Sequence, residues 1–566
     1  MSINGRYQQF YSPKMKRLVF PQGNLYDLLQ QANQGKEHEY ALDYFGQRLT
    51  YGWLFSEIER CTSALLALGI KRGEVVTVCS LLTPETLAVF YALNRLGAIS
   101  DWLDPRSSEP KIIKTLKQTK SKLLIILSPL AKVFAKALSK SSCRVVILLN
   151  PLTQAGLPSK VLGTLKGLFT PTPAFPSKIR LLTYQQLLLL AHKQPAPNIR
   201  PRPHQGAAIV HTGGTTGQPK AVLLTNESIN AEVTQVANFH LRFKRQERWL
   251  SYLPPFVVVG LVNVIHLPLI LGMELCLVPN FLTMTLAQQL KTYRPHHIPC
   301  ISLHWREIIS GKKLQNFSLD FVKSIIVGGD VFYRGMEERL IDFLRAHNCH
   351  IAPTKCYGSS ESSSVAVAGC NHQPYNKLGS VGIPLPGNQV AIYETEKKQL
   401  TGRAGVIGEI CLAGPVLMKG YYADETASKK SLRTHAGKLW LHTGDLGYLD
   451  DDGVLFLAGR SKRMIIRRGF KIYSLMIEQL LNQQEEVKIA AVVGKPDKAD
   501  DEVPCAHLVL QEDCSHRPAE VEKKLRLLCQ QHLSDYQVPV QWYFHQSLPL
   551  TANGKIDYRQ LIILSK

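Results

Sequence analysis

A glycine-rich loop, Thr212 to Lys220, constrains this chain more than any other feature. It reads Thr-Gly-Gly-Thr-Thr-Gly-Gln-Pro-Lys and follows residues 207–210, a small apolar run that is typical of a buried strand. Glycines let backbone N–H groups approach an anion, threonine hydroxyls donate to it, and the lysine adds a compact charge. The loop is not a P-loop, because Gln218-Pro219 stands where that motif needs a glycine. It predicts a phosphate site at the end of a buried strand.

The bulk composition indicates a soluble protein with more than one domain. The 566 residues exceed what one core supports, and 45% apolar with 20% charged residues is usual for globular proteins. The twelve cysteines form no CxxC pair, which argues against a zinc site or a disulfide framework and favours a reducing compartment. Residues 1–19 are polar and basic, without the apolar core of a signal peptide. We therefore expect a cytoplasmic protein.

The longest apolar stretch runs from Leu253 to Pro279. Asn263, His266 and Glu274 interrupt it, as do three prolines. A membrane-spanning helix needs about 20 predominantly apolar residues and rarely tolerates unpaired polar side chains. The stretch therefore predicts a buried strand, turn and helix rather than a membrane span.

The net charge of +23 is concentrated in one region. Between Glu109 and Glu227 there is no acidic residue, while that interval holds seventeen lysines and arginines. Inside it, residues 151–180 mix basic residues with leucines, a combination that suits peripheral contact with an anionic membrane surface. A solvated basic face explains the same pattern, and both interpretations stay open. Few aromatic residues and no recognisable binding module argue against nucleic acid as a partner.

Helical and strand patterns alternate along much of the chain. Helical periodicity covers 53–68, 87–96, 111–120 and 336–347, and apolar runs typical of strands cover 75–81, 123–127, 145–149 and 324–327. Residues 194–203, with four prolines, read as a linker. Short strands separated by glycine and aspartate fill 388–457, and a smaller α/β pattern follows Gly459. We predict an α/β protein with a large N-terminal domain of parallel βαβ sheets, a β-rich subdomain and a small C-terminal α+β domain.

Two further segments carry acidic groups suited to a nucleotide. Residues 357–361 read Tyr-Gly-Ser-Ser-Glu and place an aromatic face, hydroxyls and a carboxylate close together. Mg²⁺ is usually held by one or two carboxylates plus phosphate oxygens, which makes Glu361 a candidate ligand. Residues 443–445, Thr-Gly-Asp, follow a predicted strand, and Asp445 can accept hydrogen bonds from ribose hydroxyls.

Two more segments carry cations. Residues 459–462 read Gly-Arg-Ser-Lys and precede a basic run that contains Arg463, Arg467 and Arg468. Near the C-terminus, the glycine-punctuated loop 549–559 presents Lys555. Each segment alone has an ordinary structural explanation, but the five segments in this order do not arise by coincidence.

Together these segments resemble the acyl-activating (adenylate-forming) superfamily of AMP-binding enzymes, which includes acyl-CoA ligases, firefly-type luciferases and the adenylation domains of peptide synthetases. The resemblance runs from about Leu49 to Arg559 and includes flanking signatures at 379–384, 408–410, 420–422 and 492–497. It implies a large N-terminal domain, residues 1–460, that binds ATP and the acyl substrate. It also implies a mobile C-terminal lid domain, residues 461–566, that carries Lys555.

The resemblance also assigns a role to each motif residue. The loop at 212–220 would hold the β- and γ-phosphates, Tyr357 and the segment 329–331 the adenine, Ser360 the α-phosphate, and Asp445 with Arg460 the ribose. Lys462 would stand at the hinge. The implied nucleotide-binding residues are Thr212, Gly213, Gly214, Thr215, Thr216, Gly217, Lys220, Gly329, Asp330, Val331, Tyr357, Gly358, Ser359, Ser360, Asp445, Arg460, Lys462 and Lys555. The implied catalytic residues are Lys555, Glu361, Thr212 and Ser360, and the implied Mg²⁺ ligands are Glu361 and Thr215.

The resemblance implies a two-step reaction. A carboxylate attacks the α-phosphorus of ATP and releases pyrophosphate, and the C-terminal domain then turns so that the thiol of CoA attacks the acyl-adenylate. Lys555 would offset the charge that develops when two anions meet, as positioned donors do in a closed site. The alternative acceptor is the phosphopantetheine arm of an acyl carrier protein, whose acidic surface would suit the basic charge.

Several positions depart from the family pattern and bear on the substrate. Gly213 stands where many members have serine, a variant that resembles long-chain fatty acyl-CoA ligases, and Val257 replaces an aromatic or histidine gate residue. Ser474 and Met476 replace the usual proline and glutamate, which leaves the thioester-forming step open. The expected acyl pocket is apolar and consists of Phe256, Val257, Gly260, Leu261, Gly328 and Val365. We therefore expect a medium- or long-chain fatty acid as substrate, with chain length, oligomeric state and pathway left open.

Overall fold

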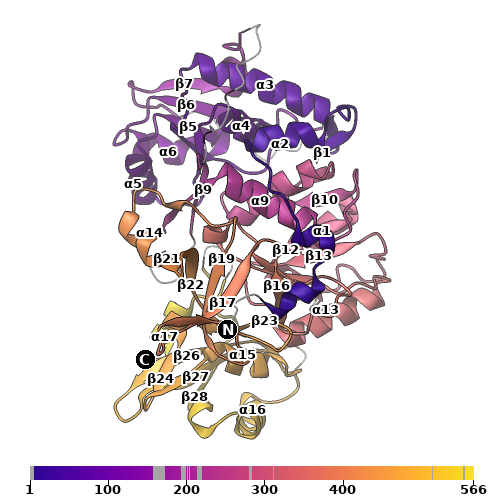
Figure 1. Ribbon diagram of the computed structural model, residues 1–566, viewed down its shortest axis with the longest axis vertical. Coiled ribbons are helices and arrows are strands. Elements are labelled where there is room, and N and C mark those ends of the chain that lie inside the picture. Colours follow the sequence, from indigo (N-terminus) through magenta and orange to yellow (C-terminus); the bar gives the residue numbers. More distant parts are fainter. Residues whose placement is uncertain are drawn as a thin grey trace.

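The computed structural model describes residues 5–156, 173–192, 199, 202, 204–212, 219–279, 284–309, 311–512, 514–551 and 555–565. Figure 1 shows three sheets with helices packed around them, and the C-terminal domain at the bottom beneath the strands β17, β19 and β22. No helix within the described ranges is long and apolar enough to cross a membrane. Most of the basic-apolar stretch 151–180 and of the predicted linker 194–203 lies outside these ranges.

The first and largest sheet combines a parallel half with an antiparallel half. The parallel half is ordered β14-β13-β12-β10-β11-β1, with β2 antiparallel to β1 at its edge. The antiparallel half, β15 to β23 without β20, is the predicted β-rich subdomain. The parallel-half strands are β1 (Tyr40–Tyr44), β2 (Gln47–Thr50), β10 (Arg248–Ser251), β11 (Glu274–Leu277), β12 (His297–Cys300), β13 (Ser324–Val327) and β14 (Thr354–Tyr357). The antiparallel strands are β15 (Val367–Ala368), β16 (Ser380–Pro384), β17 (Gln389–Glu394), β18 (Gln399–Thr401), β19 (Gly408–Ala413), β21 (Leu432–His435), β22 (Lys438–Leu449) and β23 (Leu455–Arg460).

The second sheet holds the phosphate loop. Its order is β20-β9-β8-β4-β3-β5-β6-β7, parallel from β8 to β7 and antiparallel at β9 and β20. Continuous apolar runs form its central strands because both faces are covered, as is usual for parallel sheets. The strands are β3 (Val75–Cys79), β4 (Ile99–Trp102), β5 (Leu123–Leu127), β6 (Val145–Leu149), β7 (Arg180–Thr183), β8 (Gly206–His211), β9 (Ala221–Thr225) and β20 (Gly420–Tyr421).

Helices of the N-terminal domain cover these two sheets. α4 (Pro84–Arg95) is buried along its whole length, and α9 (Asn226–Ala237) nearly so, which explains why neither shows a clean polar face. The other helices are α1 (Pro13–Lys16), α2 (Leu25–Ala32), α3 (Tyr51–Ala67), α5 (Glu109–Thr119), α6 (Ala131–Leu138), α8 (Tyr184–Leu188), α10 (Leu267–Ile270), α11 (Leu286–Tyr293), α12 (Ser302–Ile309), α13 (Arg334–Ala346) and α14 (Glu425–Ser431).

The C-terminal domain is a separate small α/β unit. Its sheet is ordered β25-β24-β27-β26, with β28 parallel to β27. Its elements are β24 (Ile465–Arg467), β25 (Phe470–Ile472), α15 (Ser474–Asn482), β26 (Val487–Asp497), β27 (Asp501–Leu510), α16 (Pro518–His532), β28 (Gln541–Phe544) and α17 (Tyr558–Leu564). α15 packs against both α13 and β23, so it forms the contact with the N-terminal domain.

Most elements predicted from the sequence are present, with two corrections. The predicted strand, turn and helix at 253–279 is wrong in its order, because π-helix η3 (Gly260–His266) and α10 come first and β11 follows. The Thr-Gly-Asp motif does not follow a strand but lies within the long strand β22, beside a register shift against β23. The first error arises because a short apolar run does not distinguish a buried helix from a strand, and the second because Gly444 does not end β22.

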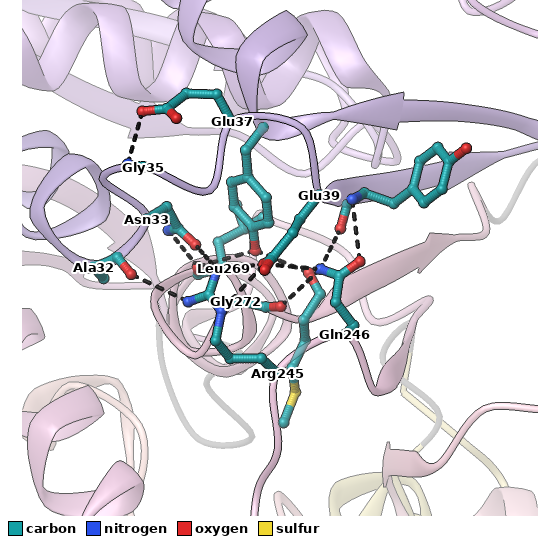
Figure 2. Close-up of polar contacts among 12 residues, drawn as sticks. Ala32, Asn33, Gly35, Glu37, Glu39, Arg245, Gln246, Leu269 and Gly272 are labelled. Carbon is teal, nitrogen blue, oxygen red and sulfur yellow. Dashed lines mark hydrogen bonds and ion pairs between the residues drawn. The ribbon is translucent and has the colours of Figure 1, made fainter.

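A polar clamp fixes the C-terminal end of the η3–α10 segment (Figure 2). Arg245 donates from Nη1 to the Ala32 carbonyl at 3.1 Å and from Nη2 to Glu39 Oε2 at 2.6 Å. Asn33 Nδ2 donates to the Leu269 carbonyl at 3.0 Å, and Gln246 Nε2 donates to the Gly272 carbonyl at 3.1 Å. The carbonyls that end α10 are therefore satisfied by side chains, as a buried helix end requires.

Candidate active site

The phosphate loop is closed at its base by its first and last residues. The Thr212 N–H donates to the Lys220 carbonyl and the Lys220 N–H donates to Thr212 Oγ1, both at 3.0 Å. The intervening positions, which include Gly213, Gly214, Thr215, Thr216 and Gly217, lie outside the described residues. The two ends of the loop therefore lie at the paired ends of β8 and β9 in the second sheet.

Tyr421 links the loop to Glu361. Its hydroxyl donates to Glu361 Oε1 at 2.9 Å, and Lys220 Nζ lies 4.3 Å from the centre of its ring. Strand β20 holds this tyrosine because it pairs with β9, directly after the loop. The contact brings a cation and a carboxylate to one wall. The sequence motifs gave Tyr421 no role beyond a flanking signature.

The adenine and ribose candidates converge on Asp445. Tyr357 ends β14 and donates from its hydroxyl to Asp445 Oδ2 at 3.0 Å, while Arg460 Nε lies 2.8 Å from Oδ1. Asp445 and Arg460 are register partners on β22 and β23, so the sheet itself sets their distance. Burial raises the pKa of Asp445, and the neighbouring guanidinium opposes that shift. Ser359 and Ser360 follow Tyr357, and Ser360 begins the short 3₁₀ turn that carries Glu361.

A hydrogen-bonded chain supports the Thr-Gly-Asp segment from behind. His442 Nδ1 lies 2.8 Å from Glu409 Oε2, and its Nε2 lies 2.9 Å from His435 Nε2. Glu409 Oε1 in turn accepts from the Gly444 N–H at 2.9 Å. These residues position the backbone before Asp445. Glu409 belongs to the predicted 408–410 signature, whereas His435 and His442 belong to none of the predicted motifs.

The segment 328–331 completes the base side of the site. Gly328 follows β13, and Gly329 has φ of 80°, a left-handed conformation that favours glycine. Asp330 is exposed, and its Oδ1 accepts a hydrogen bond from the Val331 N–H at 2.8 Å. An open carboxylate at this turn faces the lysine of the other domain.

Lys555 of the C-terminal domain belongs to the same cluster. Burial lowers the pKa of Lys555, and the carboxylates of Asp330 and Asp445 oppose that shift, while Arg460 adds to it. The loop that bears it is closed by the Thr551 N–H, which donates to the Lys555 carbonyl at 2.7 Å. The charges of Asp330, Asp445 and Arg460 in the N-terminal domain therefore act on Lys555 across the domain boundary.

A buried glutamate fixes that domain orientation. Glu478 Oε2 on α15 accepts from the Tyr333 hydroxyl of the N-terminal domain at 3.1 Å and from Tyr558 at 3.3 Å. Arg463 stacks on Tyr558 with its guanidinium carbon 3.7 Å from the ring centre. Sequence reasoning missed this contact, because its partners lie far apart in the chain. Lys462 lies in the exposed 3₁₀ turn between β23 and β24, and its hinge role stays a prediction.

The acyl-pocket candidates gather around η3. Phe256 and Leu261 are buried, Val257 is partly exposed, and a Cβ on Gly260 would lie 1.9 Å from the Pro254 carbonyl oxygen, so the chain needs glycine there. Val365 is buried at the end of the segment that begins with Tyr357. π-Helical turns are rare in proteins, and those that occur frequently lie at functional sites. The pocket candidates thus adjoin the adenylate candidates through one continuous segment.

Of the two predicted Mg²⁺ ligands, Glu361 lies among the described residues. Glu361 is partly exposed, and Tyr421 occupies one of its two oxygens, which leaves a carboxylate suited to a hard cation beside the phosphate loop. Glu361 therefore fits Mg²⁺, whereas Thr215 lies outside the described residues.

Comparison with known proteins agrees with this geometry. Residues 28–422 match the AMP-binding enzymes, and residues 476–555 match the AMP-binding enzyme C-terminal domain. The chain is 28% identical over 551 residues to a long-chain-fatty-acid–CoA ligase of Bacillus subtilis (strain 168), covering 96% of this chain and 95% of that one. It is 26% identical over 526 residues to a 2-succinylbenzoate–CoA ligase of Listeria monocytogenes, covering 92% and 96%. The fold matches that of ATP-bound MatB from Rhodopseudomonas palustris with a TM-score of 0.80, at 20% identity and covering 96% and 99% of the two chains.

Proposed function

Because the chain belongs to the AMP-binding enzyme family, we propose that it activates an apolar monocarboxylic acid, a medium- or long-chain fatty acid, and transfers the acyl group to the thiol of CoA. The chain is an AMP-forming acid–thiol ligase. The observation that carries the proposal is the contact of Tyr357 and Arg460 with Asp445, together with Tyr421, which contacts both Glu361 and Lys220 at the end of the predicted phosphate loop. In this proposal Lys555 acts where the acid and the α-phosphate of ATP meet.

In the first step the carboxylate attacks the α-phosphorus, a P–O bond forms, and the bond to pyrophosphate breaks. Lys555 offsets the negative charge that gathers on the equatorial oxygens, and Lys220 with the phosphate loop holds the leaving pyrophosphate. Mg²⁺, held by Glu361, would supply further charge neutralisation when bound. Asp445 and Tyr357 fix the nucleoside, so that attack occurs in line. Such positioned charges act strongly because the closed site excludes water.

In the second step the CoA thiolate attacks the acyl carbon, and AMP leaves. We propose that this step needs the C-terminal domain to turn near Lys462, which breaks the Glu478–Tyr333 contact and withdraws Lys555. Conformational gating of this kind separates two half-reactions without changing the chemistry of either. The Tyr333 hydroxyl is the only N-terminal-domain donor to Glu478 among the described contacts, and the turn would also separate α15 from α13 and Lys471 from Glu396.

The identity of the acid rests on the pocket and on the relatives together. Phe256, Leu261 and Val365 line a mainly apolar region, which favours a hydrocarbon body. One relative is named for long-chain fatty acids and another for 2-succinylbenzoate. An acidic carrier protein is the alternative acceptor and is distinguished by the same experiment.

The test is pyrophosphate release by the purified protein with ATP, Mg²⁺ and a panel of carboxylic acids, with the adenylate trapped by hydroxylamine. We expect fatty acids to give acid-dependent hydroxamate, and added CoA to give thioester. If thioester forms on a carrier protein but not on CoA, the acceptor is the carrier protein and not CoA. The absence of acid-dependent pyrophosphate release across the panel would contradict the proposal.

A further inference from the structure

A buried carboxyl and a buried amide meet in the wall of the proposed acyl pocket. Glu232 lies on α9 and Asn263 lies in η3, and Asn263 Nδ2 donates to Glu232 Oε1 at 2.8 Å. The relative exposure of Glu232 is 0% and that of Asn263 is 6%, so bulk water does not solvate either group. A carboxyl without charged partners is rare at such depth, because its transfer from water is costly.

The pair is incompletely satisfied by the protein. Glu232 Oε1 also accepts from the Val365 N–H at 3.2 Å. The second oxygen, Oε2, and the amide oxygen Oδ1 of Asn263 are buried without a hydrogen-bond partner among the described residues. An unpaired buried polar atom costs about 1–3 kcal/mol, so two adjacent ones call for a specific explanation.

Neighbouring polar groups on the same two helices show the contrast. One turn away, Asn230 of α9 and Tyr91 bracket His266 of η3, with ring nitrogens 3.1 Å from Asn230 Oδ1 and 3.0 Å from the Tyr91 hydroxyl. Gln235 of α9 exchanges two hydrogen bonds with the Asn388 amide. Within the described residues, α9 and η3 satisfy most of their buried polar atoms and leave open the Glu232–Asn263 pair, apart from Glu227 Oε2 at the start of α9.

One pocket candidate contacts the pair, and another lies one helical turn from it. Val365 donates to Glu232 directly, and Asn263 lies one helical turn after Val259 and Gly260. Gly328 lies beside Cys356, because a Cβ built on this glycine would be 3.4 Å from Cys356 Cβ. The pKa of Cys356 is raised chiefly by burial and secondly by the charge of Glu232. The pair therefore lies among the acyl-pocket residues rather than elsewhere in the core.

The hydrogen-bonding character of the pair selects a ligand group. Burial raises the pKa of Glu232 to about 8, so the carboxyl is mostly protonated at neutral pH. Oε1 already accepts two hydrogen bonds, which leaves the proton on Oε2 as a donor, while Asn263 Oδ1 can only accept. A hydroxyl group of a ligand can accept from one of these atoms and donate to the other.

We propose that Glu232 and Asn263 form a polar subsite in the acyl pocket that receives a hydroxyl group of the substrate acid, so that the preferred substrate is a hydroxylated apolar acid. This inference rests on the proposed function and narrows its substrate class. A site built to bond a hydroxyl discriminates strongly against the analogue that lacks it, because the protein atoms then remain unpaired.

The experiment compares dodecanoic acid with hydroxydodecanoic acids whose hydroxyl moves along the chain, and cinnamic acid with its ring-hydroxylated forms, by acid-dependent ATP–pyrophosphate exchange. For the best-placed hydroxyl we expect kcat/KM at least about tenfold above the parent acid. In Glu232→Leu and Asn263→Leu this preference should disappear, chiefly through KM, while Glu232→Gln should retain part of it.

A matched control separates specificity from stability. Glu85 on α4 is another deeply buried carboxyl, and it lies near Glu57 rather than beside the pocket candidates. Glu85→Gln should leave the ratio between hydroxylated and parent acids unchanged. If the wild-type protein activates the parent acids as well as or better than every hydroxylated acid, the inference is overturned and the proposed function stands. If none of the acids tested supports ATP–pyrophosphate exchange, the proposed function is overturned instead.

Discussion

Two polar networks hold the same helical segment, η3–α10, and they differ in how completely the protein satisfies them. At the C-terminal end, every nitrogen of the Arg245 guanidinium donates to an oxygen of Ala32, Asn33 or Glu39. Where α9 packs on η3, Glu232 of α9 and Asn263 of η3 each keep one oxygen without a partner among the described residues. A network that is complete without ligand stabilises the fold, whereas an incomplete one beside a pocket acts on the ligand. Variants of the first should therefore alter stability, and variants of the second should alter kinetics.

Lys555 belongs to the ligand-facing class and gives the largest expected effect. Lys555→Ala should lower adenylate formation by about 10²–10³, because a positioned charge is lost from the transition state. The melting temperature and the thioester formed from a supplied acyl-adenylate should change little. ATP–pyrophosphate exchange and thiolysis of the supplied adenylate measure the two steps separately. Lys488→Ala, which removes a surface lysine paired with Glu512, serves as the control. Equal loss in both steps would contradict the role given to Lys555.

The protonation of Glu232 predicts a pH-dependent stability. Its folded-state pKa of about 8 lies above the unfolded value of 4.5, so its stabilising contribution is complete below pH 4.5 and is lost as the pH rises through 8. Compared with Glu232→Gln, the wild-type protein should lose free energy of unfolding, on the order of a few kcal/mol, across that interval. Urea unfolding of both proteins at several pH values measures the difference. Parallel pH profiles would show that Glu232 titrates normally.

Tyr421 tests a smaller effect at the phosphate wall. Tyr421→Phe removes the hydrogen bond to Glu361 but keeps the ring that Lys220 contacts. Loss of such an outer contact typically weakens metal binding about tenfold or more, so the variant should need more Mg²⁺ for half-maximal pyrophosphate release. The KM for ATP at saturating Mg²⁺ should be nearly unchanged. Tyr422→Phe is the neighbouring control, and an equal shift there would argue against the contact.

Arg245 tests the complete network and has the smallest expected effect on activity. Arg245→Ala removes the donor of the clamp in Figure 2 and should lower the free energy of unfolding by about 1–2 kcal/mol. The ratio of kcat/KM between hydroxylated and parent acids should stay at the wild-type value. A changed ratio with unchanged stability would reverse the distinction between the two networks.

The sequence predicted the architecture well because its signals are local. Runs such as 123–127 and 145–149 become buried parallel strands, and the glycine-rich loop follows its strand as expected. The order of elements in 253–279 was wrong because apolar residues there support either a strand or a buried helix. Among the predicted site residues, the structure brings Arg460 and Tyr357 into contact with Asp445, and their roles stay predictions.

The residues that sequence reasoning missed depend on distant partners. Glu478 contacts Tyr333, and Tyr421 contacts Glu361, across 145 and 60 positions of the chain. Glu232 was overlooked because an acidic residue within a helix normally indicates a solvated face. Only the packing of α9 against η3 shows that this carboxyl is buried. Our proposal adds this polar pair to the apolar pocket that the sequence predicts.

The most direct test of the account follows oxygen from the acid into the nucleotide. An acid labelled with heavy oxygen in its carboxylate is incubated with ATP, Mg²⁺ and CoA, and the products are weighed by mass spectrometry. Attack on the α-phosphorus predicts that AMP acquires one labelled oxygen and that pyrophosphate acquires none. Label in inorganic phosphate or pyrophosphate, with unlabelled AMP or with ADP as product, would contradict adenylation at this site.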